Sequence, residues 1–180
     1  MARTTALGVS LLTIFLWAAA SVVYSNISTS DVAMSKYPLP PVDLPTLTPT
    51  ADASASTNAI QQITETGEPY LLNFWASWCV TCQAESRFLH GIADDVPIVG
   101  VALKDAPESA SRWLNDFGSP YTLSYIDEEG KYAEQLGVQG APETFLIDGE
   151  GNVRFHYQGL MQDTVWRQRV MPILNGLKQD

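Results

Sequence analysis

A short apolar run leads directly into both cysteines of the chain. Residues Tyr70–Trp75 are typical of a buried strand, and residues 83–93 predict a helix. Cys79 and Cys82 stand between these two elements in Cys-x-x-Cys spacing. The pattern therefore predicts that Cys79 lies at the first turn of the helix, where free N–H groups and the helix dipole stabilise a thiolate.

The spacing of the two cysteines favours redox chemistry. Cys82 is one helical turn after Cys79, so we expect Cys79 to attack a partner's disulfide and Cys82 to resolve the mixed disulfide. The alternatives are an inert disulfide or half of a zinc site. Zinc needs about four ligands, and His90 and His156 stand in no ligand-like spacing with the cysteines. We expect no metal and no other cofactor.

The composition is that of a globular domain and argues against a nucleic-acid-binding protein. A chain of 180 residues with 46% hydrophobic content can bury a core without disulfide cross-links. The net charge of −10 argues against nucleic acid as a partner and provides no basic stripe for anionic lipid headgroups.

The amino terminus predicts export. Ala6–Tyr24 is free of charge and about 19 residues long, close to the length that crosses a bilayer, and Arg3 precedes it. We therefore expect residues 1–24 to form a single-pass signal-anchor in the cytoplasmic membrane, with the rest of the chain outside the cytoplasm, where disulfides persist. The alternative is a cleaved signal peptide with its cleavage site at Ala18–Ala20. Both interpretations export the remainder.

A change of composition follows the anchor. Residues 25–67 are rich in proline, serine, threonine and alanine, which predicts a linker. The alternative for residues 39–47 is partial packing on the edge of the domain. We assign residues 68–180 to one folded domain.

That domain alternates between strand and helix signals. Strands are predicted at residues 97–103, 121–126, 144–147 and 153–157. Helices are predicted between Asp105 and Gly118 and at residues 131–136 and 164–177. The order is a strand, the redox helix, further strands alternating with helices, and a final hairpin. This order predicts an α/β fold, a thioredoxin-like three-layer sandwich with an N-terminal transmembrane helix.

Two helices carry more detailed predictions. Asp105 is expected to cap the helix that precedes Gly118, with Glu108 three residues later, and Gly118 to end it. The helix faces expected to be buried are Ala110, Trp113, Leu114 and Phe117 in one helix, and Trp166, Val170, Ile173 and Leu177 in the last, where Pro172 introduces a bend.

Two segments of the chain carry specific motifs, Leu71–Glu85 (LLNFWASWCVTCQAE) and Gly137–Asp148 (GVQGAPETFLID). Both resemble the DsbE/CcmG family, membrane-anchored thioredoxin-like proteins of cytochrome c maturation. A Trp-Cys-x-x-Cys motif alone is shared by all relatives of thioredoxin, whereas the motif of the second segment is specific to far fewer proteins. Members of the family often have proline where this chain has Val80. Residues between the cysteines tune the redox potential. The potential implied by the resemblance therefore does not carry over to this chain, whereas the reaction class does.

The resemblance implies roles for residues around the cysteines. Pro142 is expected to be a cis-proline that faces Cys79. The backbone of Ala141 would then lie beside the dithiol, where an extended substrate strand can pair with it. Without the motif, Pro142 would be an ordinary proline at the start of a strand. Trp78 is expected to contact partners, and Trp75 to pack inside.

The resemblance also places Glu85 and Glu143 near the dithiol, as residues that tune its potential. A carboxylate disfavours a neighbouring thiolate, and this makes the reduced dithiol a better electron donor. The alternatives are a solvated acid in an early helical turn for Glu85 and a surface strand residue for Glu143. His90 and His156 are assigned no catalytic role.

The implied function is that of a periplasmic thiol:disulfide oxidoreductase that acts as a reductant in cytochrome c maturation. The implied donor is a DsbD- or CcdA-type membrane protein, and the implied acceptor is apocytochrome c or a maturation factor. Two alternatives stay open: a reductase of similar build in another pathway of the cell envelope, and a non-enzymatic module that holds apocytochrome or delivers copper. Copper delivery would favour a Cys-x-x-x-Cys pair, so the two-residue gap argues against it.

Overall fold

The central strand of the sheet, β2 (Tyr70–Trp75), is buried along its whole length. It pairs in parallel with β3 (Ile98–Leu103) and antiparallel with β5 (Glu143–Ile147). A strand covered on both faces reads as a nearly continuous apolar run, which explains the sequence pattern. A computed structural model of the chain describes residues 36–47, 63 and 65–178, all of which belong to one compact unit.

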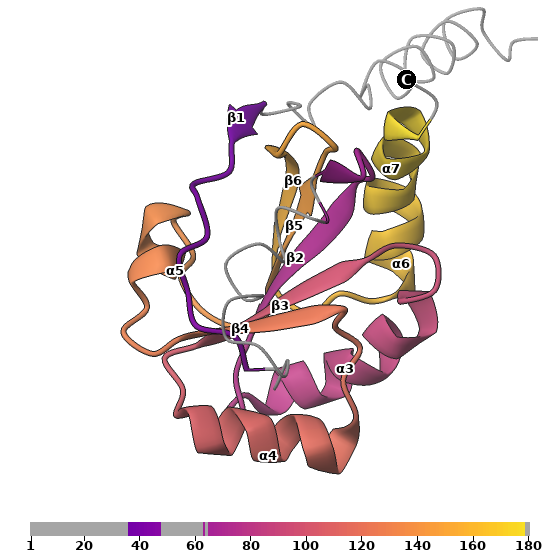
Figure 1. The fold of residues 1–180 in the computed structure, drawn as a ribbon. Helices are drawn as coiled ribbons and strands as arrows, with labels where there is room; N and C mark the ends of the chain where they lie inside the picture. The colour runs from indigo at the N-terminus through magenta and orange to yellow at the C-terminus, as the bar shows by residue number, and fades with distance from the viewer. Residues whose placement is uncertain (1–35, 48–62, 64, 179–180) are drawn as a thin grey trace, which may run out of the picture. The chain divides into compact units, whose positions relative to one another are not determined.

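Within the described residues, six strands form one sheet in the order β1-β6-β5-β2-β3-β4 (Figure 1). The strands at the two edges are β1 (Tyr37–Pro38) and β4 (Leu123–Asp127), and β6 (Asn152–Gln158) lies between β1 and β5. The pairs β2–β3 and β3–β4 are parallel, whereas β5 and β6 form an antiparallel hairpin. The predicted strands are therefore confirmed, with bounds shifted by one or two residues.

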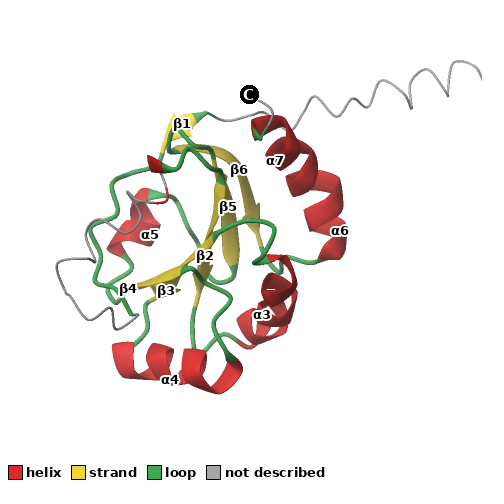
Figure 2. Cartoon of the chain, turned by 45° about the vertical axis from the view of Figure 1, so that its right-hand side comes forward, coloured by secondary structure: helices red, strands yellow, loops and turns green. Residues whose placement is uncertain are grey.

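Helices cover both faces of the sheet. One face carries α3 (Val80–Ile92), α4 (Pro107–Phe117) and a C-terminal helical segment (Figure 2). This segment consists of α6 (Asp163–Val165), a π-helical turn (Trp166–Val170) and α7 (Met171–Leu177). The other face is covered by α5 (Lys131–Gln135) and by apolar side chains from residues 39–44. The arrangement is the expected three-layer α/β sandwich.

Residues 36–47 pack on the sheet, so the prediction of a linker is wrong for this segment. Tyr37 pairs with Val153 of β6, and the Leu47 N–H donates to the Ser124 carbonyl at 2.8 Å. Leu39, Val42 and Leu44 pack against the core on the side of α5. The alternative, packing on the edge of the domain, is confirmed. The prolines of this segment have no backbone N–H to donate to a neighbouring strand. Burial of the apolar side chains between them on the sheet contributes more free energy than these missing hydrogen bonds cost.

The remaining expectations for the amino-terminal part lie outside the described residues. They are the anchor at residues 1–24 and the linker before residue 36. Among the helices that the structure does describe, none combines the length and apolar character needed to cross a bilayer.

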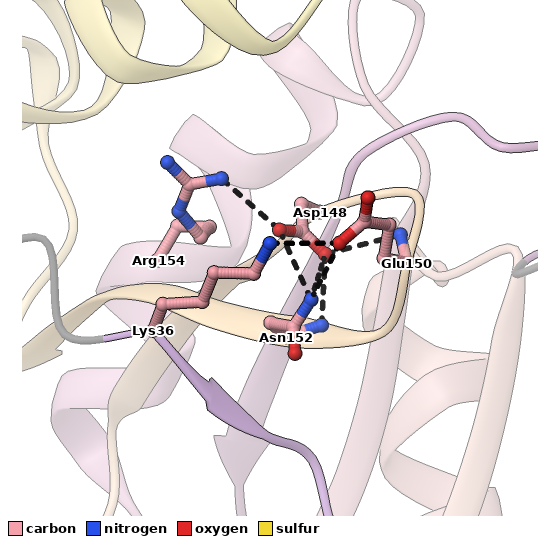
Figure 3. A network of polar contacts seen from close by, with 5 residues as sticks. All are labelled: Lys36, Asp148, Glu150, Asn152 and Arg154. Atoms are coloured by element: carbon pink, nitrogen blue, oxygen red, sulfur yellow. Dashed lines mark hydrogen bonds and ion pairs between the residues drawn. The ribbon is translucent and has the colours of Figure 1, made fainter.

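A polar network fixes the β5–β6 turn to the start of the packed segment (Figure 3). The Asp148 carboxylate accepts hydrogen bonds from the N–H groups of Glu150 and Asn152 and from Arg154 at 3.1 Å. Burial alone would raise the pKa of Asp148, but these hydrogen bonds outweigh it and lower the pKa below its ordinary value. Lys36 pairs with Glu150 at 2.8 Å, so the turn also holds the residue before β1.

Two helix faces differ in part from the prediction. In the C-terminal segment Trp166, Val170 and Leu174 are buried, whereas Ile173 is only half-buried. The Met171 N–H donates to the Trp166 carbonyl across the wider π turn, which rotates the residues that follow. In α4, Phe117 is 49% exposed and its ring lies 5.3 Å from the Trp113 ring, so its assignment to the buried face is wrong.

Candidate active site

Cys79 is the N-cap of α3 and forms a disulfide with Cys82. The Cys82 N–H donates to the Cys79 sulfur at 3.0 Å. This N–H is one of the free donors of the first helical turn, so it would also stabilise a thiolate at Cys79 once the disulfide is reduced. The predicted position of Cys79 at the start of the helix is confirmed.

The disulfide lies just below the surface. Cys79 is 7% exposed and Cys82 is 3% exposed, while Trp78 and Val80 on either side of Cys79 are 56% and 81% exposed. Cys79 is therefore the more exposed of the two cysteines, and its two chain neighbours form an exposed rim around it. Trp75 is fully buried against the rings of Trp113 and Tyr121, as expected for a packing residue.

A second loop, which leads into β5, faces the cysteines. The Ala141–Pro142 peptide bond is cis, as the resemblance implies. The Cys79 sulfur lies 3.4 Å from the Ala141 carbonyl oxygen. The backbone next to Pro142 therefore borders the Cys79 sulfur.

The loop before Cys79 is held by the turn that follows β3. The Asp105 carboxylate accepts hydrogen bonds from the Ser77 N–H, from the Ser77 hydroxyl at 2.8 Å and from the Ala106 N–H at 2.9 Å. The Trp78 indole N–H donates to the Lys104 carbonyl at 3.1 Å, and Lys104 has a left-handed backbone with φ of 46°. Two adjacent residues thus fix the loop that carries Trp78.

The role predicted for Asp105 is therefore wrong. The N-cap of α4 is Ala106, and no side chain caps this helix end. The carboxylate turns instead toward Ser77, where it satisfies both a backbone N–H and a hydroxyl in a partly buried site. Two such bonds to a charged group outweigh the single bond that a helix cap would make.

Glu85 lies inside the protein beneath α3. It is 1% exposed, and its carboxylate accepts hydrogen bonds from the Asn73 amide at 3.0 Å and the Met161 N–H at 2.6 Å. Burial raises the pKa of Glu85 to about 7, although both hydrogen bonds act in the opposite direction. The alternative of a solvated acid is thus wrong. Glu85 and Cys82 are buried together on the same face of α3, one turn apart.

Glu143 is also buried, so the alternative of a surface strand residue is wrong as well. It is 3% exposed and follows Pro142 at the start of β5. One carboxylate oxygen accepts from the N–H groups of Gln139 at 2.7 Å and Gly140 at 2.9 Å. The other accepts from Nε2 of His156 at 2.7 Å. Glu143 therefore ties the loop that contains Ala141 to β6.

Residues 41–169 match the Redoxin family. The thiol:disulfide interchange protein DsbE of Haemophilus influenzae is 41% identical over 140 residues, which cover 77% of this chain and 76% of that protein. The chain belongs to the DsbE family. DsbE of Yersinia pestis is 46% identical over 114 residues, covering 63% of this chain and 61% of its own length. The chain thus spans about three fifths of the Yersinia relative.

Solved structures agree with this DsbE assignment. A DsbE-type protein described as putative, from Chlorobium tepidum, has a TM-score of 0.54 at 25% identity and covers 63% of this chain and 84% of its own. A secreted thiol-disulfide isomerase from Corynebacterium glutamicum has a TM-score of 0.62 over 79% of this chain and 89% of its own. At 18% identity the second likeness concerns the fold alone, and it supports the thioredoxin-like α/β architecture.

Sequence reasoning missed two residues of the DsbE site, Ser77 and His156. Ser77 has no signal in a single sequence, because its partner is on a distant turn. For His156 a signal exists. The β5–β6 hairpin pairs Glu143 with Gln158 and Phe145 with His156, so His156 lies diagonally across from Glu143 on the same face. Building the register of the predicted hairpin would have brought the two side chains together.

Proposed function

We propose that this DsbE-family chain is a membrane-anchored, exported thiol:disulfide reductase that donates electrons to disulfides in cytochrome c maturation. The observation that carries the proposal is the position of Cys79. It caps α3, receives the Cys82 N–H and lies between exposed neighbours beside the Ala141 carbonyl. A sulfur in this position is stabilised as a thiolate and borders the surface.

The reaction proceeds by two exchanges. The Cys79 thiolate attacks one sulfur of the acceptor's disulfide, and the other sulfur leaves as a thiolate that takes up a proton. The Cys82 thiolate then attacks the Cys79 sulfur, forms the Cys79–Cys82 disulfide and releases the second acceptor thiol. Two electrons pass to the acceptor. Two thiols of a DsbD- or CcdA-type membrane donor return the pair to the reduced state by the reverse exchange.

The neighbours of Cys79 would orient the acceptor. We assign Ala141 and Pro142 to pairing with an extended segment of the acceptor, because the Ala141 carbonyl lies 3.4 Å from the Cys79 sulfur. Trp78 would provide an apolar contact, since most of its surface is open while its indole N–H is fixed on Lys104. Fixing a large aromatic side chain in advance lowers the entropy lost on binding.

Glu85 and Glu143 would favour the reducing direction. Both carboxylates are buried on elements that carry or border the cysteines. Negative charge near the pair disfavours a thiolate, so the reduced form is less stable and gives up its electrons more readily. Residues 1–24 would hold the domain at the periplasmic side of the cytoplasmic membrane.

The test uses a peptide with an oxidised Cys-x-x-Cys-His sequence, the haem-attachment pattern of c-type cytochromes. Reduced protein should reduce this peptide faster than a peptide of the same composition with its cysteines spaced differently. Equal rates would support a general envelope reductase and contradict the cytochrome role.

A trapping variant identifies the acceptor in cells. Cys82→Ser should leave partners attached to Cys79 as mixed disulfides, and apocytochrome c or a maturation factor should be among them. Recovery of only unrelated secreted proteins would contradict the proposal. The double variant Cys79→Ser, Cys82→Ser is the control: if it still supports cytochrome c maturation, the protein holds apocytochrome without reducing it.

A further inference from the structure

His156 makes a short contact that the proposed reaction does not use. Its Nε2 lies 2.7 Å from Oε2 of Glu143, and its ring stacks on Phe145 with centroids 4.0 Å apart and planes 6° from parallel. The side chain of Glu143 is 4% exposed and that of His156 is 28% exposed. Stacking fixes the ring plane, so the N–H is aimed at the carboxylate without further loss of side-chain freedom.

The same carboxylate continues the contact to the loop beside Cys79. Its Oε1 accepts from the N–H groups of Gln139 and Gly140, and the next residue, Ala141, places its carbonyl 3.4 Å from the Cys79 sulfur. A continuous series of contacts therefore leads from β6 through Glu143 to the backbone that borders the reactive sulfur.

We propose that His156 is a positioning residue, which holds the Glu143 carboxylate in place and thereby keeps residues 139–141 in the conformation that receives an extended acceptor. The inference rests on the proposed function, because it concerns the loop assigned to acceptor binding.

The physical reason is the burial of Glu143. No other described residue donates a hydrogen bond to Oε2, so without His156 this oxygen would be buried and unpaired. A buried charged oxygen without a partner is costly, and rotation of the carboxylate toward water would relieve this cost. That rotation would also withdraw Oε1 from Gln139 and Gly140 and release the loop.

Paired variants separate the hydrogen bond from the ring. His156→Phe keeps an aromatic ring on Phe145 but removes the donor, whereas His156→Gln keeps an N–H close to the position of Nε2. His90→Phe is the matched control, since the hydrogen bonds of the other histidine of the chain are to the Ser86 carbonyl and hydroxyl on α3. His156→Leu provides the same loss of the donor if His156→Phe does not fold.

Amide hydrogen exchange of the oxidised protein measures directly how well the hydrogen bonds of residues 139–141 are formed. In His156→Phe the amides of Gln139 and Gly140 should exchange about tenfold faster than in the wild type, as expected for the loss of one charge-assisted hydrogen bond. His156→Gln and His90→Phe should match the wild type. This measurement does not depend on the identity of the acceptor.

Kinetics give the second readout. For the oxidised Cys-x-x-Cys-His peptide, His156→Phe should raise KM about fivefold with kcat changed less than twofold, and His156→Gln should restore KM. Wild-type exchange and KM in His156→Phe would overturn the inference, and so would equal defects in His156→Phe and His156→Gln. A wild-type protein that fails to reduce the peptide contradicts the proposed function instead.

Discussion

The carboxylate of Asp105 accepts two hydrogen bonds from Ser77, one from its backbone N–H and one from its hydroxyl. Ser77 precedes Cys79 by two residues, whereas Asp105 follows β3. A partly buried carboxylate that is paired in this way holds the loop before the redox helix more firmly than the loop's own backbone does.

Asp105→Ala should therefore lower the free energy of unfolding by about 2 kcal/mol, because it leaves the Ser77 N–H without its acceptor. Ser77→Ala removes only the hydroxyl bond and should cost about 1 kcal/mol. Urea unfolding of the oxidised protein measures both. Glu108→Ala is the control, since Glu108 is exposed in the first turn of α4 and would form a capping box only if Asp105 capped this helix. A larger loss in Glu108→Ala than in Asp105→Ala would contradict this account.

Glu85 should make stability fall as pH rises from about 4.5 to about 7. Its pKa is raised from 4.5 to about 7 in the folded protein, so over this interval the unfolded chain releases a proton that the folded protein keeps. The free energy of unfolding should fall by about 3 kcal/mol over this pH interval. Urea unfolding at several pH values measures the slope, and Glu85→Gln should abolish this part of it. An unchanged slope in the variant would assign the pH dependence to other groups.

Glu143→Gln should make the Cys79–Cys82 couple more oxidising. Removing a buried negative charge favours the thiolate and so stabilises the reduced form, by roughly 30 mV for each 1.4 kcal/mol. Equilibration with glutathione or a reference dithiol measures the potential. Glu134→Gln, at an exposed position of α5, changes the net charge equally and should leave the potential unchanged. A more reducing Glu143→Gln protein would refute the proposed tuning.

Gly100→Ala should destabilise the sheet by about 1–3 kcal/mol through overpacking. A Cβ at this position would lie 2.8 Å from the Tyr121 ring and 2.9 Å from the Trp75 indole nitrogen. Gly91→Ala on α3 is the contrasting variant, because a Cβ there meets open space, and it should stabilise the protein by about 0.5–1 kcal/mol. Urea midpoints compare the two. Equal shifts of the urea midpoint in the two variants would mean that the side chains around Trp75 rearrange at little cost, which would contradict this prediction.

Local patterns predicted much of the fold and part of the site. The apolar run of β2, the helix after Cys79 and the β5–β6 hairpin each depend on residues close together in sequence, and all three are confirmed. The cis bond before Pro142 was expected only from the family motif, since its spacing in the chain carries no such information.

Contacts between distant segments could not be predicted in this way. Asp105 has a stronger partner in Ser77 than any that its own helix offers, and the π turn moves Leu174 rather than Ile173 into the core. Phe117 continues the period of α4 beyond the surface that the sheet provides, so it stays half exposed. Each outcome depends on tertiary geometry that the periodicity of one segment does not contain.

The docking of residues 36–47 has a practical consequence for producing the domain. A recombinant fragment that starts at Glu68, the first residue of the predicted domain, would lack β1 and uncover the side of the core that Leu39 and Leu44 protect. Such a fragment should aggregate or be cut by proteases during purification. A fragment that starts at Ser35 retains this cover, and it is the version to use for crystallisation and titration.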